Sequence, residues 1–228
     1  MMSLVTHNKE EATMEFEKVV KSRHSVRNFT DQAVSKQTIC EIIEIAQQSP
    51  SWFNSQPWKV YVAMDKLLEN IKTECSKNNR AKKPAEPDFP VMDRNEWNVR
   101  TKANMEKWRH DIVHHLSDFD DTQNEAGLSL YNAPVILYLT IPKNSSLWSV
   151  FDAGSFGQTI MLTAKDMGLD TLPNYNSVRF PKIVRHQLGI PDSETLVVGI
   201  SLGYAKDATP NTHSTGRATL DDVLKFNN

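Results

Sequence analysis

Three side chains near the amino terminus have the types and the spacing to bind a phosphate group. Arg23, Ser25 and Arg27 alternate with His24 and Val26, so in an extended stretch all three point to one side. Two guanidinium groups and one hydroxyl can then donate several hydrogen bonds to a single oxyanion. The competing interpretation is a solvated basic turn, which accounts for many such triplets when they occur alone.

A second group of polar side chains lies in a loop that two prolines stiffen. Residues 49–58 read SPSWFNSQPW. Asn54 and Gln56 each offer two donors and one acceptor on the frame set by Pro50 and Pro57, which suits a ligand rich in hydroxyl and amide groups. The alternative is that these side chains bond only the backbone of their own loop, with the two tryptophans in the core.

Composition favours a globular protein of one or two domains. The chain has 228 residues, 39% of them hydrophobic, which is enough for one sizeable core. Lys and Arg (26) nearly balance Asp and Glu (28), so a net charge of −2 provides no broad positive field for nucleic acid. The eight glycines form neither a GxGxxG nor a GxxxxGKS/T motif. A nucleotide or phosphorylated cofactor would need a different binding device.

The cysteines and the uncharged segments indicate the cell compartment in which we expect the protein. Cys40 and Cys75 form no CxxC pair, which argues against a disulfide framework and a thiolate zinc site. Residues 1–13 have no apolar signal-peptide core, and the uncharged run 127–142 is too short to span a bilayer. We therefore expect a protein of the reducing cytoplasm, with no membrane or nucleic-acid partner.

Hydrophobic periodicity predicts helices that pack against short apolar strands. We expect helices over 13–21, 35–48, from 65 onward, 94–116, 152–167 and 181–188, and strands over 59–63, 135–141 and 195–202. Thr13, Ser35 and Asp65 are the expected N-caps, and Phe16 and Val20 are expected to face inward from the first helix. The second strand is apolar on both faces, as a central strand requires.

The two polar segments occur in order, and together they resemble a known family. RHSVRNF (23–29), followed by SPS and NSQPW within 49–58, is similar to the paired signatures of the FMN-dependent nitroreductase family. The similarity continues through 152–164, MGLDTLP (167–173), LGIP (188–191), the strand 197–203 and Arg217. The family implies an α+β fold, with a mostly antiparallel central sheet flanked by helices. It also implies a domain-entwined homodimer with FMN at each interface.

The resemblance assigns the phosphate-binding residues of this cofactor. It implies that Arg23, Ser25 and Arg27 hold the FMN phosphate together with Arg217, while His24 contributes backbone near the flavin. Many members have a lysine two residues before the terminal arginine. Here a neutral threonine stands at that position, so Arg27 is expected to supply the missing charge.

Two further segments are implied to contact the flavin. One reaches across the dimer interface to the partner's flavin and consists of Pro50, Ser51, Trp52 and Asn54, with Gln56 near the ribityl chain or the ring edge. The other presents a backbone N–H to flavin N5 and consists of Pro173, Asn174, Tyr175 and Asn176. Many members have an acidic residue and a glycine after that proline, so only the backbone donor is carried over here.

The implied activity is hydride transfer from NADH or NADPH through flavin N5 to a nitroaromatic, a quinone or a similar small acceptor, by a ping-pong mechanism. One pocket serves donor and acceptor in turn, which agrees with the absence of a dinucleotide motif. FMN carries the redox chemistry, so no catalytic side chain is assigned.

Two alternative functions stay open. The chain could act in reductive dehalogenation or flavin handling, or it could be an FMN-binding sensor or storage protein with slow turnover.

The resemblance stops over Ser76 to Asp121, which we interpret as a variable insertion at about 76–121 in a single domain that spans 1–228. Its prolines and charges predict a cap over the flavin that contains Trp97 and Trp108, although packing is the alternative for both rings. His110 and His114 have the spacing of a zinc site on a helix, but a solvated helix face is favoured and no metal is expected.

Overall fold

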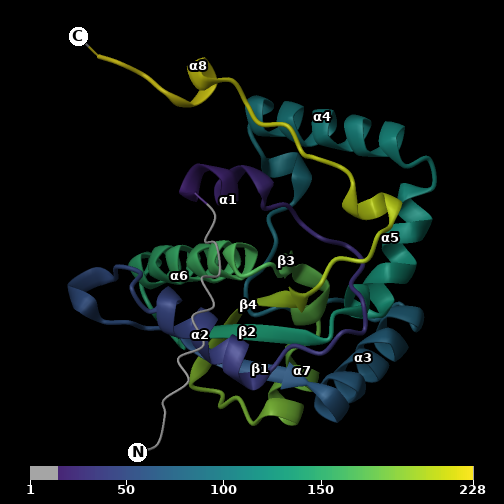
Figure 1. The fold of residues 1–228 in the computed structure, drawn as a ribbon, viewed down its shortest axis with the longest axis vertical. Coiled ribbons are helices and arrows are strands. Elements are labelled where there is room, and N and C mark those ends of the chain that lie inside the picture. The colour runs from purple at the N-terminus through teal and green to yellow at the C-terminus, as the bar shows by residue number, and fades with distance from the viewer. Residues whose placement is uncertain (1–14, 228) are drawn as a thin grey trace, which may run out of the picture.

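The computed structural model describes residues 15–227. Its centre is a four-stranded antiparallel sheet with the strand order β1-β2-β4-β3 (Figure 1). The strands are β1 (Lys59–Met64), β2 (Val135–Pro142), β3 (Asp170–Asn174) and β4 (Glu194–Gly203). β2 therefore lies in the interior of the sheet, as its apolar sequence predicts.

Helices cover both faces of this sheet. They are α1 (Phe16–Ser22), α2 (Lys36–Ala46), α3 (Asp65–Arg80), α4 (Val99–His115), α5 (Phe119–Leu128), α6 (Leu147–Asp166), α7 (Pro181–Leu188) and α8 (Leu220–Val223). α2 and α6 share one hydrophobic cluster with the sheet, and α3 and α7 share another. In the described part of the chain, no helix is both long and apolar enough to cross a membrane.

The two clusters meet at β2, because successive side chains of a strand point to opposite faces. Ile136 and Tyr138 belong to the cluster under α3 and α7, while Leu137 and Leu139 belong to the cluster under α2 and α6. All four side chains are fully buried. This explains why the strand is apolar at every position rather than at alternate ones.

The structure corrects the expected first helix. Thr13, its expected N-cap, lies outside the described residues. α1 buries only Val19, whereas 74% of Phe16 and 41% of Val20 is exposed, so the expected inward orientation of these two residues is wrong. α1 packs on α6 through a narrow contact. The apolar spacing therefore predicts a wider buried face than this helix has.

Two further local expectations differ in outcome. Ser35 is the N-cap of α2, and its hydroxyl accepts a hydrogen bond from the Thr38 N–H at 2.9 Å, as predicted. Asp65 is not a cap, because Met64 occupies that position and Asp65 begins α3 with a φ of 51°.

The apolar pattern does not predict β3, because Pro173 interrupts it. A proline is tolerated here because β3 lies at the edge of the sheet.

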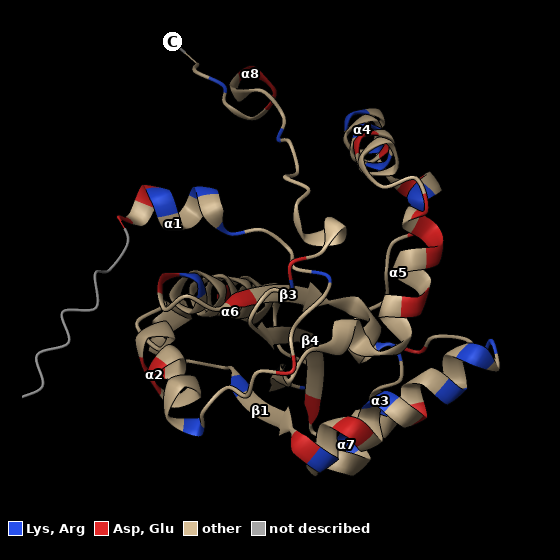
Figure 2. Ribbon diagram, turned by 45° about the vertical axis from the view of Figure 1, so that its right-hand side comes forward, with Lys and Arg blue, Asp and Glu red and all other residues tan. Residues whose placement is uncertain are grey.

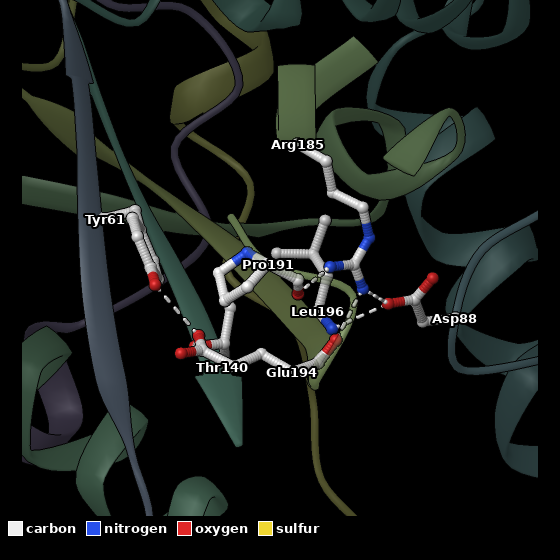
Figure 3. A network of polar contacts seen from close by, with 7 residues as sticks. All are labelled: Tyr61, Asp88, Thr140, Arg185, Pro191, Glu194 and Leu196. Carbon is white, nitrogen blue, oxygen red and sulfur yellow. Dashed lines mark hydrogen bonds and ion pairs between the residues drawn. The ribbon is translucent and has the colours of Figure 1, made fainter. Parts of the chain in front are cut away.

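A polar network fastens three strands to α7 at one end of the sheet (Figure 3). The buried carboxylate of Glu194 accepts hydrogen bonds from Tyr61 Oη at 3.0 Å, Thr140 Oγ1 at 2.6 Å and Lys59 Nζ at 2.5 Å. The backbone carbonyl of Glu194 accepts a hydrogen bond from Arg185 Nη2 at 2.6 Å. These contacts tie β1, β2 and β4 to one helix.

The same network attaches part of the expected insertion to the sheet. Asp88 forms an ion pair with Arg185, and its carboxylate accepts a hydrogen bond from the Leu196 N–H at 2.8 Å (Figure 3). Leu196 lies near the start of β4. The chain around Asp88 is therefore anchored at the start of β4, while the end of that strand, at Gly203, pairs with the start of β3.

Glu194→Gln is expected to lower the free energy of unfolding at pH 7 by about 1–3 kcal/mol. The reason is that a neutral amide replaces the carboxylate that accepts hydrogen bonds from Lys59, Tyr61 and Thr140. Burial alone would raise the pKa of the Glu194 carboxyl, but hydrogen bonds from Lys59, Thr140 and Tyr61 hold this pKa below its ordinary value. A lowered pKa in the folded state adds stability above the ordinary pKa, and that stability is lost as the pH falls.

Urea denaturation of the wild-type protein and Glu194→Gln between pH 3 and pH 8 measures this effect. The difference between their free energies of unfolding should narrow below about pH 4. Glu69→Gln is the matched control, because Glu69 pairs with Lys72 at the surface with 67% of its side chain exposed. Equal losses for the two variants at pH 7 would show that the network does not stabilise the fold.

Candidate functional site

A cavity of about 890 Å³ brings together the arginines that the sequence singled out. Arg23, His24, Ser25 and Arg27 line it from the chain that follows α1, and Arg217 lines it from the C-terminal segment. Figure 2 shows the chain that leaves α1 meeting this segment above β3. Residues almost two hundred positions apart thus border one space.

The chain after α1 is held in an extended conformation beside β3. Val26 N–H donates a hydrogen bond to the Thr171 carbonyl at 3.1 Å, and Ser25 forms a parallel bridge with Thr171. Further along, Phe29 N–H donates to the Tyr131 carbonyl at 3.1 Å. Because the backbone is extended, alternate side chains turn to the same side, and the predicted triplet faces one cavity.

Asn211 clamps the C-terminal segment onto this extended chain. Its Oδ1 accepts hydrogen bonds from Arg27 N–H at 2.7 Å and Asn28 N–H at 3.1 Å. Its Nδ2 donates to the carbonyls of Asn28 at 2.7 Å and Lys206 at 2.8 Å. Asn211 is only 9% exposed. Nothing in the sequence pattern predicts this role, because all four bonds go to backbone groups far from it or across a turn.

The three arginines have no anionic partner within residues 15–227, where none of them forms an ion pair. Arg27 Nη1 donates to the Ser25 carbonyl at 3.1 Å, and Arg217 Nη1 donates to the carbonyl of Thr215 at 2.7 Å. Burial, followed by the charge of Arg217, lowers the pKa of Arg23, and burial lowers the pKa of Arg27. An oxyanion in the cavity would relieve these penalties, so the donor set fits a phosphate.

Of the two tryptophans in the expected insertion, only Trp108 lines the arginine cavity. Its ring packs edge-on against Phe119 at a centroid distance of 5.8 Å. Trp97 lies outside this cavity in the stretch between η2 (Arg94–Glu96) and α4. The α4 portion of the segment therefore borders the cavity, and the two tryptophans occupy different environments.

His213 also lines the cavity, and the sequence did not indicate it. Its Nε2 atom is buried and has no hydrogen-bond partner in the part of the chain that the structure describes. Burial, followed by the charges of His115 and Arg27, lowers the pKa of His213. By contrast, His110 and His114 stack at 6.2 Å on the exposed face of α4, and no group of three or more possible metal ligands occurs among residues 15–227.

None of the residues expected in the loop 50–56 lines the arginine cavity of the same chain. This loop contains η1 (Trp52–Asn54) and extends beside the start of α6, at the left of Figure 1. Trp52 N–H donates to Asp152 Oδ2 at 3.1 Å, and Gln56 Nε2 donates to Asn54 Oδ1 at 3.1 Å. Ser51 Oγ accepts from the Gln56 N–H at 2.9 Å. Pro50 lies at the start of the same loop.

The loop displays its aromatic side chains to solvent. Phe53 is 88% exposed and Trp52 is 53% exposed, and Trp52 stacks on Trp148 of α6 at 5.1 Å. Phe151 adds a further exposed ring at 6.2 Å from Trp148. In contrast, Trp58 is buried against Phe156 at 4.6 Å, so the two tryptophans of this segment have opposite environments.

The segment expected near flavin N5 divides between β3 and η4 (Tyr175–Val178). Pro173 is exposed at the sheet edge and Tyr175 is 43% exposed. The side chain of Asn174 is buried and its Nδ2 donates to Ser201 Oγ at 3.0 Å, while its Oδ1 caps η4 by accepting from the Ser177 N–H. The Asn174 side chain is therefore used within the fold.

Asn176 connects this segment to the arginines. Its Nδ2 donates to Tyr131 Oη at 3.1 Å, and the charge of Arg27 acts on the same tyrosine, whose pKa burial nevertheless raises. Gly127 of α5 lies directly beside the amide, because a Cβ atom there would sit 2.5 Å from Asn176 Nδ2. A side chain at position 127 would therefore displace the Asn176 amide from its place beside Tyr131.

Comparison with known proteins agrees with the fold and the site. The sequence matches the model described as "Nitroreductase family" over residues 20–204. The chain belongs to the nitroreductase family. A 4-nitrobenzoate reductase from Pseudomonas putida is 35% identical across 88% of this chain and 90% of that protein. A nitrobenzene nitroreductase from Ectopseudomonas oleovorans is 30% identical across 91% of this chain and 95% of that protein.

A solved structure agrees with this family assignment. The FMN-dependent nitroreductase NfnB from Mycobacterium smegmatis, crystallised with NADPH, has a TM-score of 0.86 and 26% identity. The match covers 93% of this chain and 97% of that chain. The predicted α+β nitroreductase fold is confirmed, while the homodimer and the individual site residues stay predictions.

Inorganic phosphate is expected to raise the Tm of the flavin-free protein by binding the arginine cavity, and Arg23→Ala is expected to reduce this rise. At a phosphate concentration 100 times the Kd, binding adds about 2.7 kcal/mol to the free energy of unfolding. Differential scanning calorimetry at constant ionic strength measures the effect. Arg94→Ala controls for general salting effects, because Arg94 is exposed and outside the cavity. An equal rise in Arg23→Ala and Arg94→Ala would contradict phosphate binding here.

Proposed function

We propose that this protein is an NAD(P)H-dependent nitroreductase that uses FMN and reduces a nitroaromatic, a quinone or a similar small acceptor by a ping-pong mechanism. The observation that carries the proposal is the cavity in which Arg23, Arg27 and Arg217 meet without an anionic partner among the described residues. Membership of the nitroreductase family supports FMN as the source of the anion that this cavity accommodates.

The residues present fit the phosphate end of FMN. Arg23, Arg27 and Arg217 would hold the phosphate dianion, and Ser25 would donate a hydroxyl hydrogen bond to it. When bound, FMN would supply the redox chemistry, namely hydride transfer from the nicotinamide and reduction of the acceptor. The chain itself would position the cofactor and neutralise the charge of its phosphate, and no side chain is assigned a catalytic role.

Other residues of the chain would orient the ring and limit access of water. The backbone N–H of Asn176 is the proposed donor beside flavin N5, with its side chain held by Tyr131 and packed on Gly127. Trp108 contributes an aromatic wall to the cavity. A single pocket used in turn by donor and acceptor gives the ping-pong order.

The two alternatives are less well supported. Two relatives that cover most of this chain are named for reduction of 4-nitrobenzoate and nitrobenzene, which favours a nitroaromatic acceptor over dehalogenation or flavin handling. A sensor or storage protein would keep its flavin oxidised in the presence of NAD(P)H. The colour of the protein during turnover separates these functions.

The purified protein is expected to be yellow with FMN, because the cavity fits a terminal phosphate and the sequence has no pyrophosphate-binding motif. Under anaerobic conditions, NADH or NADPH should bleach the colour, and 4-nitrobenzoate or nitrobenzene should restore it. Chromatography of heat-released flavin and absorbance spectra measure both steps. A majority of FAD, or colour that neither nicotinamide bleaches, would contradict the proposal.

We also propose a homodimer in which the loop 50–56 completes the partner's site. The support is the exposed aromatic surface formed by Trp52, Phe53, Trp148 and Phe151, which would leave apolar area in water on a monomer. In an isologous dimer, the loop of each chain would lie against the partner's arginine cavity, and this contact would remove the aromatic surface from water.

Phe53→Ser is expected to weaken this dimer and release FMN together, because Phe53 is 88% exposed in the single chain. Sedimentation velocity over a dilution series, with flavin absorbance as a second signal, measures both. Phe226→Ser is the matched control, since Phe226 is 82% exposed and outside the aromatic surface. A monomer that retains FMN tightly would contradict the shared site.

A further inference from the structure

A second cleft, of about 570 Å³, lies between the end of α3, α5 and η4. Arg80, Lys82, Lys83 and Arg179 line it, against the single carboxylate of Glu125. Its remaining polar lining consists of amide side chains. The cleft therefore carries a local excess of positive charge on a chain whose net charge is −2.

Most of this charge is not neutralised inside the described part of the chain. Lys82 and Lys83 form no ion pair there. Arg80 reaches Glu125 only at 3.5 Å, and 63% and 72% of the two side chains is exposed, so the pair is weak. Arg179 Nη1 donates to the neutral amide oxygen of Asn79 at 2.7 Å. An anionic ligand would meet unpaired cations here.

Two residues that line the cleft also carry buried hydrogen-bond donors without acceptors. Arg179 Nε and Gln123 Nε2 are buried and have no hydrogen-bond partner within residues 15–227. Both residues line the cleft. A buried N–H without an acceptor carries the full penalty of its lost hydration, so such donors usually indicate a missing partner. The two residues therefore add unused hydrogen-bonding capacity beside the cationic lining of the cleft, whose exposed lysines and arginines fit the oxygens of a carboxylate or a phosphate.

The position of the cleft relates it to the proposed flavin site. Asn176 forms part of its lining, and the same residue is bonded to Tyr131, on which the charge of Arg27 acts. Arg27 lines the arginine cavity. The lining of the cleft therefore includes the residue proposed to lie beside the flavin ring.

We propose that this basic cleft binds an anionic oxygen group of a molecule that reacts at the flavin, and so favours a donor or acceptor that carries this group over a counterpart that lacks it. The inference rests on the proposed function and deepens it. The group has two possible sources, namely the carboxylate of an aromatic acceptor and the ribose 2′-phosphate that distinguishes NADPH from NADH. Both present the oxygens that cations and N–H donors bind.

The double variant K82Q/K83Q tests the proposal, because both lysines are exposed and removing them leaves the core intact. The matched control is K66Q/K77Q, which removes two exposed lysines of α3 that do not line the cleft. Steady-state KM values are measured for 4-nitrobenzoate and nitrobenzene with NADH as donor. They are also measured for NADPH and NADH with nitrobenzene as acceptor.

In K82Q/K83Q the KM for at least one anionic member of a pair should rise about fivefold or more, while its neutral or less charged counterpart changes little. A rise for 4-nitrobenzoate identifies the carboxylate, and a rise for NADPH identifies the phosphate. Equal changes within both pairs, or the same changes in K66Q/K77Q, would overturn the proposal. FMN content and NADH-driven reduction of nitrobenzene test the proposed function separately, since NADH lacks the 2′-phosphate and nitrobenzene lacks the carboxylate.

Discussion

The unpaired positive charge of three arginines is the constraint on which the site depends. Arg23, Arg27 and Arg217 border one cavity without carboxylate partners in the described chain, and the like charge of Arg217 acts on Arg23. The fold holds them by backbone contacts rather than by counter-charges, through the bonds of the extended chain to β3 and through the four hydrogen bonds of Asn211. Because no carboxylate of the described chain pairs with these cations, their charge remains available to bind an external anion.

The rest of the fold supplies the rigidity that this arrangement needs. β2 is buried on both faces and joins two hydrophobic clusters, while the Glu194 network fixes one end of the sheet. The opposite end of β4 pairs with β3, beside which the arginine-bearing chain runs. The loop 50–56 is positioned by α6 and projects outward. The same chain thus has a cationic cavity at one surface and an exposed aromatic surface at another.

The sequence could predict features that depend on local spacing, and it could not predict those that depend on distant contacts. The alternation of Arg23, Ser25 and Arg27, the Ser35 cap and the interior place of β2 follow from neighbouring residues. Asn211 acts through backbone groups up to 184 residues away, which no local pattern records. The basic cleft combines α3, α5 and η4, so its charges gather only once the chain has folded.

The most direct test of the account compares the binding of FMN and riboflavin to the flavin-free protein, because the two ligands differ only in the phosphate. Isothermal titration calorimetry should find FMN bound at least about 100-fold more tightly, since each charge-assisted hydrogen bond contributes roughly 1.5–3 kcal/mol. The double variant with Arg23→Ala and Arg217→Ala should remove most of that difference. Riboflavin binding as tightly as FMN, or an unchanged ratio in the double variant, would contradict the account.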